Sequence, residues 1–265
     1  MTKSPLENMP LPHRWHGDGE PLVLIAGLGG KGTSWQPFLD AAKRRFRVLT
    51  FDNPGAGRTP PLSGPVTIRE MARCVRRLLD HLGIEKACVV GRSMGGMIAQ
   101  ELALLAPERI TRLVLVSTTA RSDGHLAQIF RFWARMAELG VAAEVRHQSS
   151  LLWCLGSMSL SSNARVQAYL EAKCTADRPH DYALQARACA RHDALERLLS
   201  LRTPTLIVSG TDDRLTPPRH AEELAKAIPG AELAYISGAA HLPYLEHPER
   251  FARVVLDYLC SEAKP

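Results

Sequence analysis

Short apolar runs alternate along this chain with stretches whose apolar positions recur at helical spacing. An apolar run of about four to eight residues bounded by turn signals indicates a buried strand, whereas apolar residues three and four positions apart indicate an amphipathic helix. The runs that predict strands are 22–26, 46–51, 87–90, 113–117, 205–209 and 233–236. The stretches that predict helices are 34–43, 68–82, 94–105, 217–228 and 241–259. This alternation is typical of an α/β fold with a mostly parallel, doubly wound sheet.

One long stretch interrupts the alternation. Between residues 119 and 201 there is no strand pattern, and helical patterns at 126–139 and 164–174 stand in a region rich in Arg, Ser and Ala. A segment of this length is more often a functional or independently folded unit than a loose loop. The sequence therefore predicts an α/β core made of residues 1–118 and 202–265, with residues 119–201 inserted as a helical cap over one edge of the sheet.

Composition and charge change this picture little. The chain has 265 residues, of which 45% are hydrophobic and 23% charged, as is ordinary for a globular protein. The net charge of +6 is spread thinly, without a basic stripe or an aromatic platform, so we expect no nucleic-acid partner. The N-terminus has no apolar signal core, and no apolar run approaches the ~18 residues of a membrane span. We therefore expect a cytoplasmic protein without a membrane partner.

Cysteine and histidine could build disulfides or metal sites. None of the 6 cysteines forms a C-x-x-C pair, and most lie among apolar neighbours, which is typical of free buried thiols in a reducing compartment. The 10 histidines include no pair at a helical metal-binding spacing with an acid nearby. We expect no metal site.

A glycine-rich turn after the first apolar run allows two interpretations. Gly27, Gly29 and Gly32 have the G-x-G-x-x-G spacing, and Asp52 ends the next apolar run, as in a dinucleotide-binding turn. Alternatively, these glycines let the backbone approach a substrate in a different kind of α/β site. The motifs further along the chain favour the second interpretation, so we expect no bound cofactor.

The sequence GRSMG places Ser93 at the centre of a G-x-S-x-G pentapeptide between a predicted strand and a predicted helix. In this context the serine lies on a tight turn that lifts its hydroxyl above the sheet. A nucleophilic serine needs a base, and the base needs an acid that orients it. On a sheet of this kind the acid and then the histidine follow the serine along the chain.

Two later strands end in the required residue types. The strand at 205–209 runs into GTDDRLTP, which contains Asp212 and Asp213, and the strand at 233–236 runs into GAAH, which ends at His241. The carboxyl ends of parallel strands meet at one edge of a sheet, so these side chains should converge with Ser93. The sequence thus predicts a Ser-His-Asp triad.

With these motifs the chain resembles the α/β-hydrolase superfamily over essentially its whole length. The matching sequences are GRSMGG, GTDDRLTP, GAAHLPYLEHPE and the earlier FDNPGAGRT. In that family the acid is the aspartate of G-x-x-D-x-x-x-P, which matches Asp213, with Asp212 as the alternative. The family histidine, in a G-x-x-H loop, matches His241. The resemblance implies the α/β-hydrolase fold with an inserted helical cap.

The resemblance also gives the glycine-rich turn a role. In the family the loop after this strand supplies one backbone N–H to the oxyanion hole, which matches Leu28, and the residue after the nucleophile supplies the other, which matches Met94. Asp52 then belongs to a structural loop. Many relatives have His-Gly where this chain has Ala26-Gly27. The variant GLGG with a downstream tryptophan is similar to the aminoacrylate-hydrolase and enol-lactonase branch.

Three further residues are candidates for substrate contacts. Arg92, beside the predicted nucleophile, could contact a substrate carboxylate or pair with an acid near the turn. Trp133 and Trp153 lie in the predicted cap. Large aromatic residues contribute to a core more often than to a binding surface, so the cap core is the competing interpretation for both tryptophans.

These residues predict a serine hydrolase that cleaves a small or medium carboxylic ester or lactone through an acyl-enzyme. Three alternatives stay open: a carbon–carbon bond hydrolase of a dienoate ring-fission product, since relatives with SMGG include such enzymes; a ligand receptor without turnover; and a perhydrolase that uses peroxide. The expected partner is the small-molecule ester, lactone or related carbonyl substrate. A homodimer and an acyl-carrier protein are further candidates.

Overall fold

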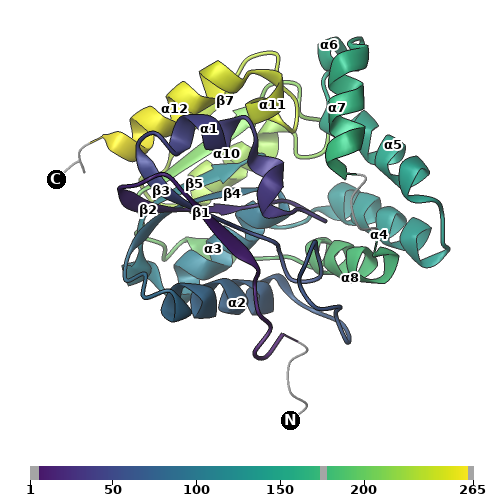
Figure 1. The fold of residues 1–265 in the computed structure, drawn as a ribbon. Helices are drawn as coiled ribbons and strands as arrows, with labels where there is room; N and C mark the ends of the chain where they lie inside the picture. Colours follow the sequence, from purple (N-terminus) through teal and green to yellow (C-terminus); the bar gives the residue numbers. More distant parts are fainter. Residues whose placement is uncertain (1–5, 174–177, 262–265) are drawn as a thin grey trace.

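Seven strands form one sheet in the computed structural model, which describes residues 6–173 and 178–261 (Figure 1). The spatial order is β1-β3-β2-β4-β5-β6-β7. The first strand runs antiparallel to β3, and all other neighbours are parallel. The strands are β1 (His13–His16), β2 (Glu20–Ile25), β3 (Phe46–Phe51), β4 (Ala87–Arg92), β5 (Ile110–Val116), β6 (Thr205–Gly210) and β7 (Glu232–Ile236). The predicted, mostly parallel α/β sheet is confirmed.

Helices cover both faces of the sheet. On one face α1 (Phe38–Ala42) packs against α12 (Pro248–Cys260), and on the other α2 (Ile68–His81) packs against α3 (Met94–Leu105) (Figure 1). Strands β4 and β6 are buried along their whole length because helices exclude water from both sides. The other core helices are η1 (Gly32–Trp35), η2 (Pro107–Arg109), α10 (Pro218–Ala227) and α11 (Pro243–Glu246).

Local signals explain where α2 begins and ends. Thr67 caps the N-terminus, since its hydroxyl accepts from the backbone N–H of Glu70 at 3.2 Å while the Glu70 carboxylate accepts from the backbone N–H of Thr67 at 2.9 Å. Gly83 follows the C-terminus with φ +64°, a left-handed conformation that glycine adopts without strain. The predicted helix at 68–82 is thus confirmed to within one residue.

Two sequence-based expectations differ from the structure. The strand β1 was not predicted, because its sequence HRWH contains no apolar run and, as an edge strand, it is only partly buried. The single helix expected over 241–259 is divided into α11 and α12, and the one expected over 34–43 into η1 and α1. Each division falls at a proline, which cannot continue a helix but readily begins one.

The predicted helical insertion lies between β5 and β6 (Figure 1). Helix α4 packs against α8, and α5 packs against α7. The backbones of Arg121 and Asp193 form an antiparallel bridge near the two ends of the insertion. Its helices are α4 (Gly124–Glu138), α5 (Ala143–Cys154), α6 (Ser157–Leu160), α7 (Asn163–Lys173), α8 (Pro179–Ala190) and α9 (Leu195–Leu198). The boundaries at 119 and 201 stay a prediction.

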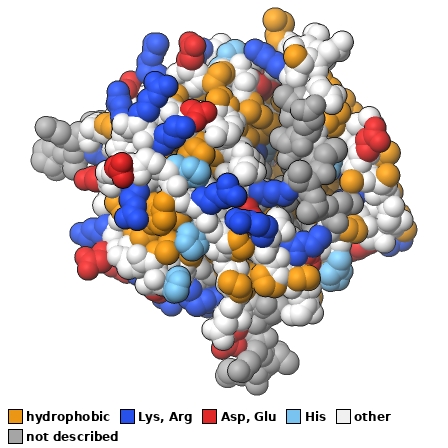
Figure 2. Space-filling view, in the orientation of Figure 1, with side chains coloured by type: hydrophobic (Ala, Val, Ile, Leu, Met, Phe, Trp, Pro, Cys, Tyr) orange, Lys and Arg blue, Asp and Glu red, His pale blue; other side chains and the backbone are white. Residues whose placement is uncertain are grey.

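The helices, the cysteines and the surface charges bear on the expectations drawn from composition. No helix within residues 6–173 and 178–261 is long and apolar enough to cross a membrane. Cys74, Cys88 and Cys189 are buried free thiols, and burial raises the pKa of the Cys74 thiol to about 11. Cys174 lies outside the described residues. On the face drawn in Figure 2, basic side chains lie in separate groups interspersed with acidic ones.

Candidate active site

Ser93 occupies a strained turn between β4 and α3. Its backbone has φ 55° and ψ −123°, a conformation that a residue with a side chain rarely adopts. The backbone N–H of Ser93 donates to the carbonyl of Val116 on β5 at 2.9 Å, and the hydroxyl of Thr118 donates to the Ser93 carbonyl at 2.8 Å. The neighbouring strand therefore holds the turn in a conformation that the local sequence alone would not maintain.

The positions two residues before and two residues after Ser93 must be glycine for a steric reason. A Cβ atom at Gly91 would collide with the carbonyl of Gly95, and a Cβ at Gly95 would collide with the carbonyl oxygen of Ile25 on β2. Both obstacles are backbone atoms, which cannot rotate away as a side chain can. The G-x-S-x-G pattern thus reflects how closely α3 begins against the ends of β2 and β4.

Asp213 and His241 are joined by a buried hydrogen bond. The Nδ1–H of His241 donates to Oδ2 of Asp213 at 2.9 Å, and the two side chains are almost fully buried. The other carboxylate oxygen, Oδ1, accepts from the backbone N–H groups of Leu215 and Thr216, each at 2.9 Å. Asp212 instead is exposed, and its carboxylate accepts from the Thr211 hydroxyl. Of the two candidate acids, the structure brings Asp213 to the histidine.

Glu246 connects the His241 loop to the insertion. Its buried carboxylate accepts from the backbone N–H of Ala240 at 2.6 Å and from that of Gly156, between α5 and α6, at 2.8 Å. The backbone N–H of His241 also donates to the carbonyl of Cys154 in α5 at 3.2 Å. The sequence reasoning did not single out Glu246, although it lies within the motif GAAHLPYLEHPE.

The glycine turn that carries Leu28 lies beside Ser93. A Cβ placed on Gly27 would be 3.3 Å from the Cβ of Ser93. Met94 is the first residue of α3, so its N–H has no acceptor within the helix. Gly27, which precedes the predicted oxyanion donor Leu28, and the second predicted donor Met94 are thus both neighbours of Ser93. No hydrogen bond joins the Ser93 hydroxyl to His241 in the part of the chain that the structure describes, and such contacts often form only with substrate bound.

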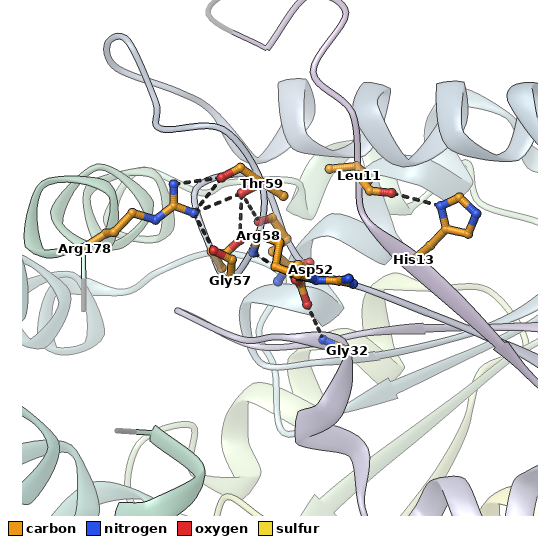
Figure 3. A network of polar contacts seen from close by, with 10 residues as sticks. Leu11, His13, Gly32, Asp52, Gly57, Arg58, Thr59 and Arg178 are labelled. Atoms are coloured by element: carbon orange, nitrogen blue, oxygen red, sulfur yellow. Dashed lines mark hydrogen bonds and ion pairs between the residues drawn. The ribbon is translucent and has the colours of Figure 1, made fainter. Parts of the chain in front are cut away.

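Asp52 is engaged within the protein. Its Oδ1 accepts from the backbone N–H of Gly32, and its Oδ2 from that of Arg58, each at 3.0 Å (Figure 3). The side chain of the next residue, Asn53, donates to the carbonyl of Ala26 at 2.7 Å. The acid that resembled a ribose ligand therefore holds together the loops that follow β2 and β3, as the structural-loop interpretation predicted.

The insertion is attached to these loops by polar side chains. Gln185 of α8 accepts from the backbone N–H of Gly29 at 2.8 Å and donates to the carbonyl of Pro54 at 2.6 Å. Arg178, just before α8, donates to the carbonyl of Thr59 at 2.8 Å (Figure 3). These contacts place the insertion over the carboxyl edge of the sheet, above the glycine turn.

A cavity of about 180 Å³ opens between the glycine turn, the His241 loop and the insertion. Its lining includes Arg92 and Leu242, the direct sequence neighbours of Ser93 and His241. Tyr244 also lines it, and burial raises the pKa of this phenol, so it stays protonated at neutral pH. From the insertion, Tyr169 reaches the cavity. A small substrate in this space would lie next to the predicted triad.

The two tryptophans predicted as substrate contacts lie elsewhere. Trp133 is buried against the ring of Phe130, with ring centroids 5.8 Å apart, and Trp153 lies against the ring of His125. Neither lines the cavity described above. Their surroundings agree with the competing interpretation that both belong to the packing of the insertion, and their role in binding stays a prediction.

Comparisons with known proteins place this arrangement in a family. A model of the alpha/beta hydrolase fold matches residues 20–248. A relative from Azorhizobium caulinodans that carries the name carbamate hydrolase RutD is 36% identical over 250 residues, which cover 93% of each chain. The enol-lactonase of Burkholderia xenovorans superposes with a TM-score of 0.89 at 27% identity over 96% of this chain and 97% of its own.

A second solved structure extends the comparison to esterases. The thermophilic esterase of Thermogutta terrifontis, in a malate-bound form, superposes with a TM-score of 0.86 at 28% identity, over 95% of this chain and 93% of its own. The family model spans β4, β6 and β7, the strands that precede Ser93, Asp213 and His241. The resemblance drawn from the sequence motifs is thereby confirmed: the chain belongs to the α/β-hydrolase fold family and is a hydrolase of that family.

Proposed function

We propose that this protein is a serine hydrolase that cleaves a small or medium carboxylic ester or lactone through an acyl-enzyme. The observation that carries the proposal is the buried hydrogen bond between Asp213 and His241 at the sheet edge where the strained turn presents Ser93. With Nδ1 of His241 engaged by the carboxylate, Nε2 is the ring nitrogen left to serve as the base.

The proposed reaction has two halves. Ser93 Oγ attacks the substrate carbonyl while His241 takes the hydroxyl proton, and Asp213 stabilises the imidazolium that forms. The backbone N–H groups of Leu28 and Met94 bind the oxyanion of the tetrahedral intermediate. His241 then protonates the leaving oxygen, and a water molecule, activated by the same histidine, releases the acid from Ser93.

The relatives support the carbonyl chemistry more closely than any one substrate. Their names refer to a carbamate, an enol-lactone and an ester. In each of these compounds a heteroatom leaves from a carbonyl carbon, so one triad can serve all three. The cavity of about 180 Å³ favours substrates with a short acyl part.

The test is a burst assay with p-nitrophenyl esters of increasing acyl length. We expect a stoichiometric burst of nitrophenol followed by steady turnover, both lost in Ser93→Ala, because removing the nucleophile of a triad costs roughly 10⁶-fold in turnover. The matched control is Ser117→Ala. Ser117 is also a buried serine with a positive φ, of 45°, at the end of the neighbouring strand, and it should keep the burst.

Two other outcomes would redirect the proposal. Ester cleavage that persists in Ser93→Ala would show that another group performs it. If no ester reacts, dienoate ring-fission products would test the carbon–carbon hydrolase, and thermal stabilisation by ligand without turnover would indicate a receptor. Peroxide in place of water as the acyl acceptor tests the perhydrolase.

A homodimer and an acyl-carrier partner stay predictions, as does the cytoplasmic location.

A further inference from the structure

Arg92 is a buried cation without an anionic partner among the residues that the structure describes. It ends β4, directly before Ser93, and is only 8% exposed. Its guanidinium lies over the ring of Tyr244 at 5.1 Å and near the ring of Trp35 at 6.0 Å. It makes no hydrogen bond or ion pair with any residue in 6–173 or 178–261, and its Nε is fully buried without an acceptor.

A buried charge without a counter-ion lowers the stability of the folded protein. A buried charge normally has a counter-ion and hydrogen-bond acceptors, since desolvation of an unpaired guanidinium is costly. The aromatic faces of Tyr244 and Trp35 offset only part of this cost and offer no acceptor for the N–H groups. The centroids of the two rings are 5.5 Å apart, so both rings lie to one side of the guanidinium and leave its N–H groups for a ligand.

The nearest carboxylate on the cavity wall does not neutralise Arg92. Glu246 lines the same cavity, yet its two oxygens accept from the backbone N–H groups of Ala240 and Gly156 and lie within ion-pair distance of no arginine in the described chain. Two further cations, Lys31 and Arg165, line the same space. The cavity therefore has three basic side chains and one carboxylate that is already engaged.

The guanidinium also lies close to the predicted nucleophile. The position of a Cβ on Gly27 is 3.4 Å from a terminal nitrogen of Arg92 and 3.3 Å from the Cβ of Ser93, so both atoms border the same small space. A ligand anion held by Arg92 would therefore lie within the length of a short acyl chain from Ser93.

We propose that Arg92 binds a carboxylate of the substrate, so that the preferred substrates are short esters or lactones whose acyl part carries a free carboxylate. This inference rests on the serine-hydrolase function proposed above and names its substrate class. A planar guanidinium binds a carboxylate through two parallel N–H···O bonds, and the neighbouring rings of Tyr244 and Trp35 line one side of the place where Arg92 would do so.

The first test compares two substrates that differ only in charge, monoethyl succinate and its carboxamide analogue ethyl succinamate. For the wild type we expect kcat/KM to favour the acid by about 10- to 100-fold, the usual range for hydrogen bonds to a charged group. In Arg92→Met this preference should disappear, because kcat/KM should fall much more for the acid than for the amide analogue. An unchanged preference, or an equal loss on both substrates, would overturn the proposal.

Arg112→Met is the matched control. Arg112 also lies over a tyrosine ring, 5.2 Å above Tyr258, but it belongs to the opposite end of the sheet, at the start of β5. It should leave the acid preference intact. Arg92→Lys keeps the charge but loses the planar guanidinium. Its preference for the acid should be weaker than that of the wild type and stronger than that of Arg92→Met.

A binding measurement separates this proposal from the one it rests on. Succinate should stabilise Ser93→Ala against thermal unfolding and bind at least about tenfold more weakly when Arg92→Met is added. This result does not require turnover, so it holds or fails independently of ester cleavage. Without ligand, Arg92→Met should unfold at the same or a higher temperature than the wild type, because it removes an unpaired buried charge. A lower temperature together with unchanged succinate binding would show that Arg92 only supports the packing.

Discussion

The sheet and the helical insertion enclose the same cavity but are built differently. The strands β4 and β6 are buried from end to end, and Ser93, Asp213 and His241 are held by buried backbone and side-chain hydrogen bonds. At least half of each of six large apolar side chains in the insertion is exposed, whereas the most exposed large apolar side chain in the described part of the core, Tyr235, is 38% exposed. The six are Phe132, Leu139, Val145, Leu152, Met158 and Leu199.

This difference follows from the number of layers. A sheet covered by helices on both faces buries its central strands, whereas the helices of the insertion pack mainly on one another and leave apolar side chains exposed. Polar side chains such as Gln185, Arg178 and Glu246 tie the insertion to the loops of the core. The predicted triad thus lies on loops of the core, and the insertion that roofs the cavity is joined to these loops by polar contacts.

The largest expected effect is on activity and concerns two buried aspartates. Asp213→Asn should reduce kcat by about 10⁴-fold with a folded protein, because an asparagine cannot hold His241 in the required tautomer. In the insertion, Asp181 is equally buried, pairs with Arg178 at 3.2 Å and accepts from the backbone N–H of Leu62. Asp181→Asn should lower stability and reduce kcat less than tenfold. Similar losses of kcat in both variants would remove the distinction between the two regions.

The second comparison concerns a glycine near the start of a helix in each region. Gly95→Ala in α3 should lower the free energy of unfolding by roughly 3 kcal/mol, since the new Cβ meets the carbonyl of Ile25. Gly124→Ala in α4 has no atom within 4 Å of the new Cβ and should be neutral or stabilising by up to about 1 kcal/mol. Urea unfolding measures both. A tolerated Gly95→Ala would mean that the turn can relax.

The free energy of unfolding should depend on pH through a histidine near the end of the insertion. His192, between α8 and α9, is buried beside Gln100, and burial lowers its pKa from 6.5 to about 4. The unfolded chain therefore takes up a proton below about pH 6.5 that the folded protein does not. The free energy of unfolding should fall between pH 6.5 and 4, by roughly 3 kcal/mol at most. In His192→Gln this contribution should vanish, so the difference between the two unfolding curves measures it; parallel curves would contradict the buried neutral histidine.

The smallest expected effect is at the exposed face of the insertion. Met158 is 80% exposed, so Met158→Gln should change the free energy of unfolding by less than about 0.5 kcal/mol. Leu126→Ala in the same insertion is the control, because Leu126 is fully buried and its truncation should cost about 2–5 kcal/mol. A loss at Met158 that grows with protein concentration would indicate that a second copy covers this face, which is the homodimer that the sequence left as a candidate.

The sequence by itself determined the strands, the order of the candidate triad and the family, because these depend on local signals. Apolar runs mark buried strands, and the glycines of GRSMGG are required wherever a serine sits on so tight a turn. Local signals failed where the chain lacks them. The edge strand β1 has no apolar run, and prolines divided the two helices that were expected to be continuous.

Only the tertiary structure decided which polar side chains have partners. It brought Asp213 rather than Asp212 to His241 and gave Glu246 two backbone donors that lie six and ninety residues away in the sequence. It left Arg92 without a hydrogen-bond acceptor among the residues that the structure describes. Hydrogen bonding and desolvation depend on atoms that are distant in sequence, and no periodicity records them. The same amino acid, arginine, can therefore be a solvated surface charge or a buried site for an anion, and the sequence does not distinguish the two.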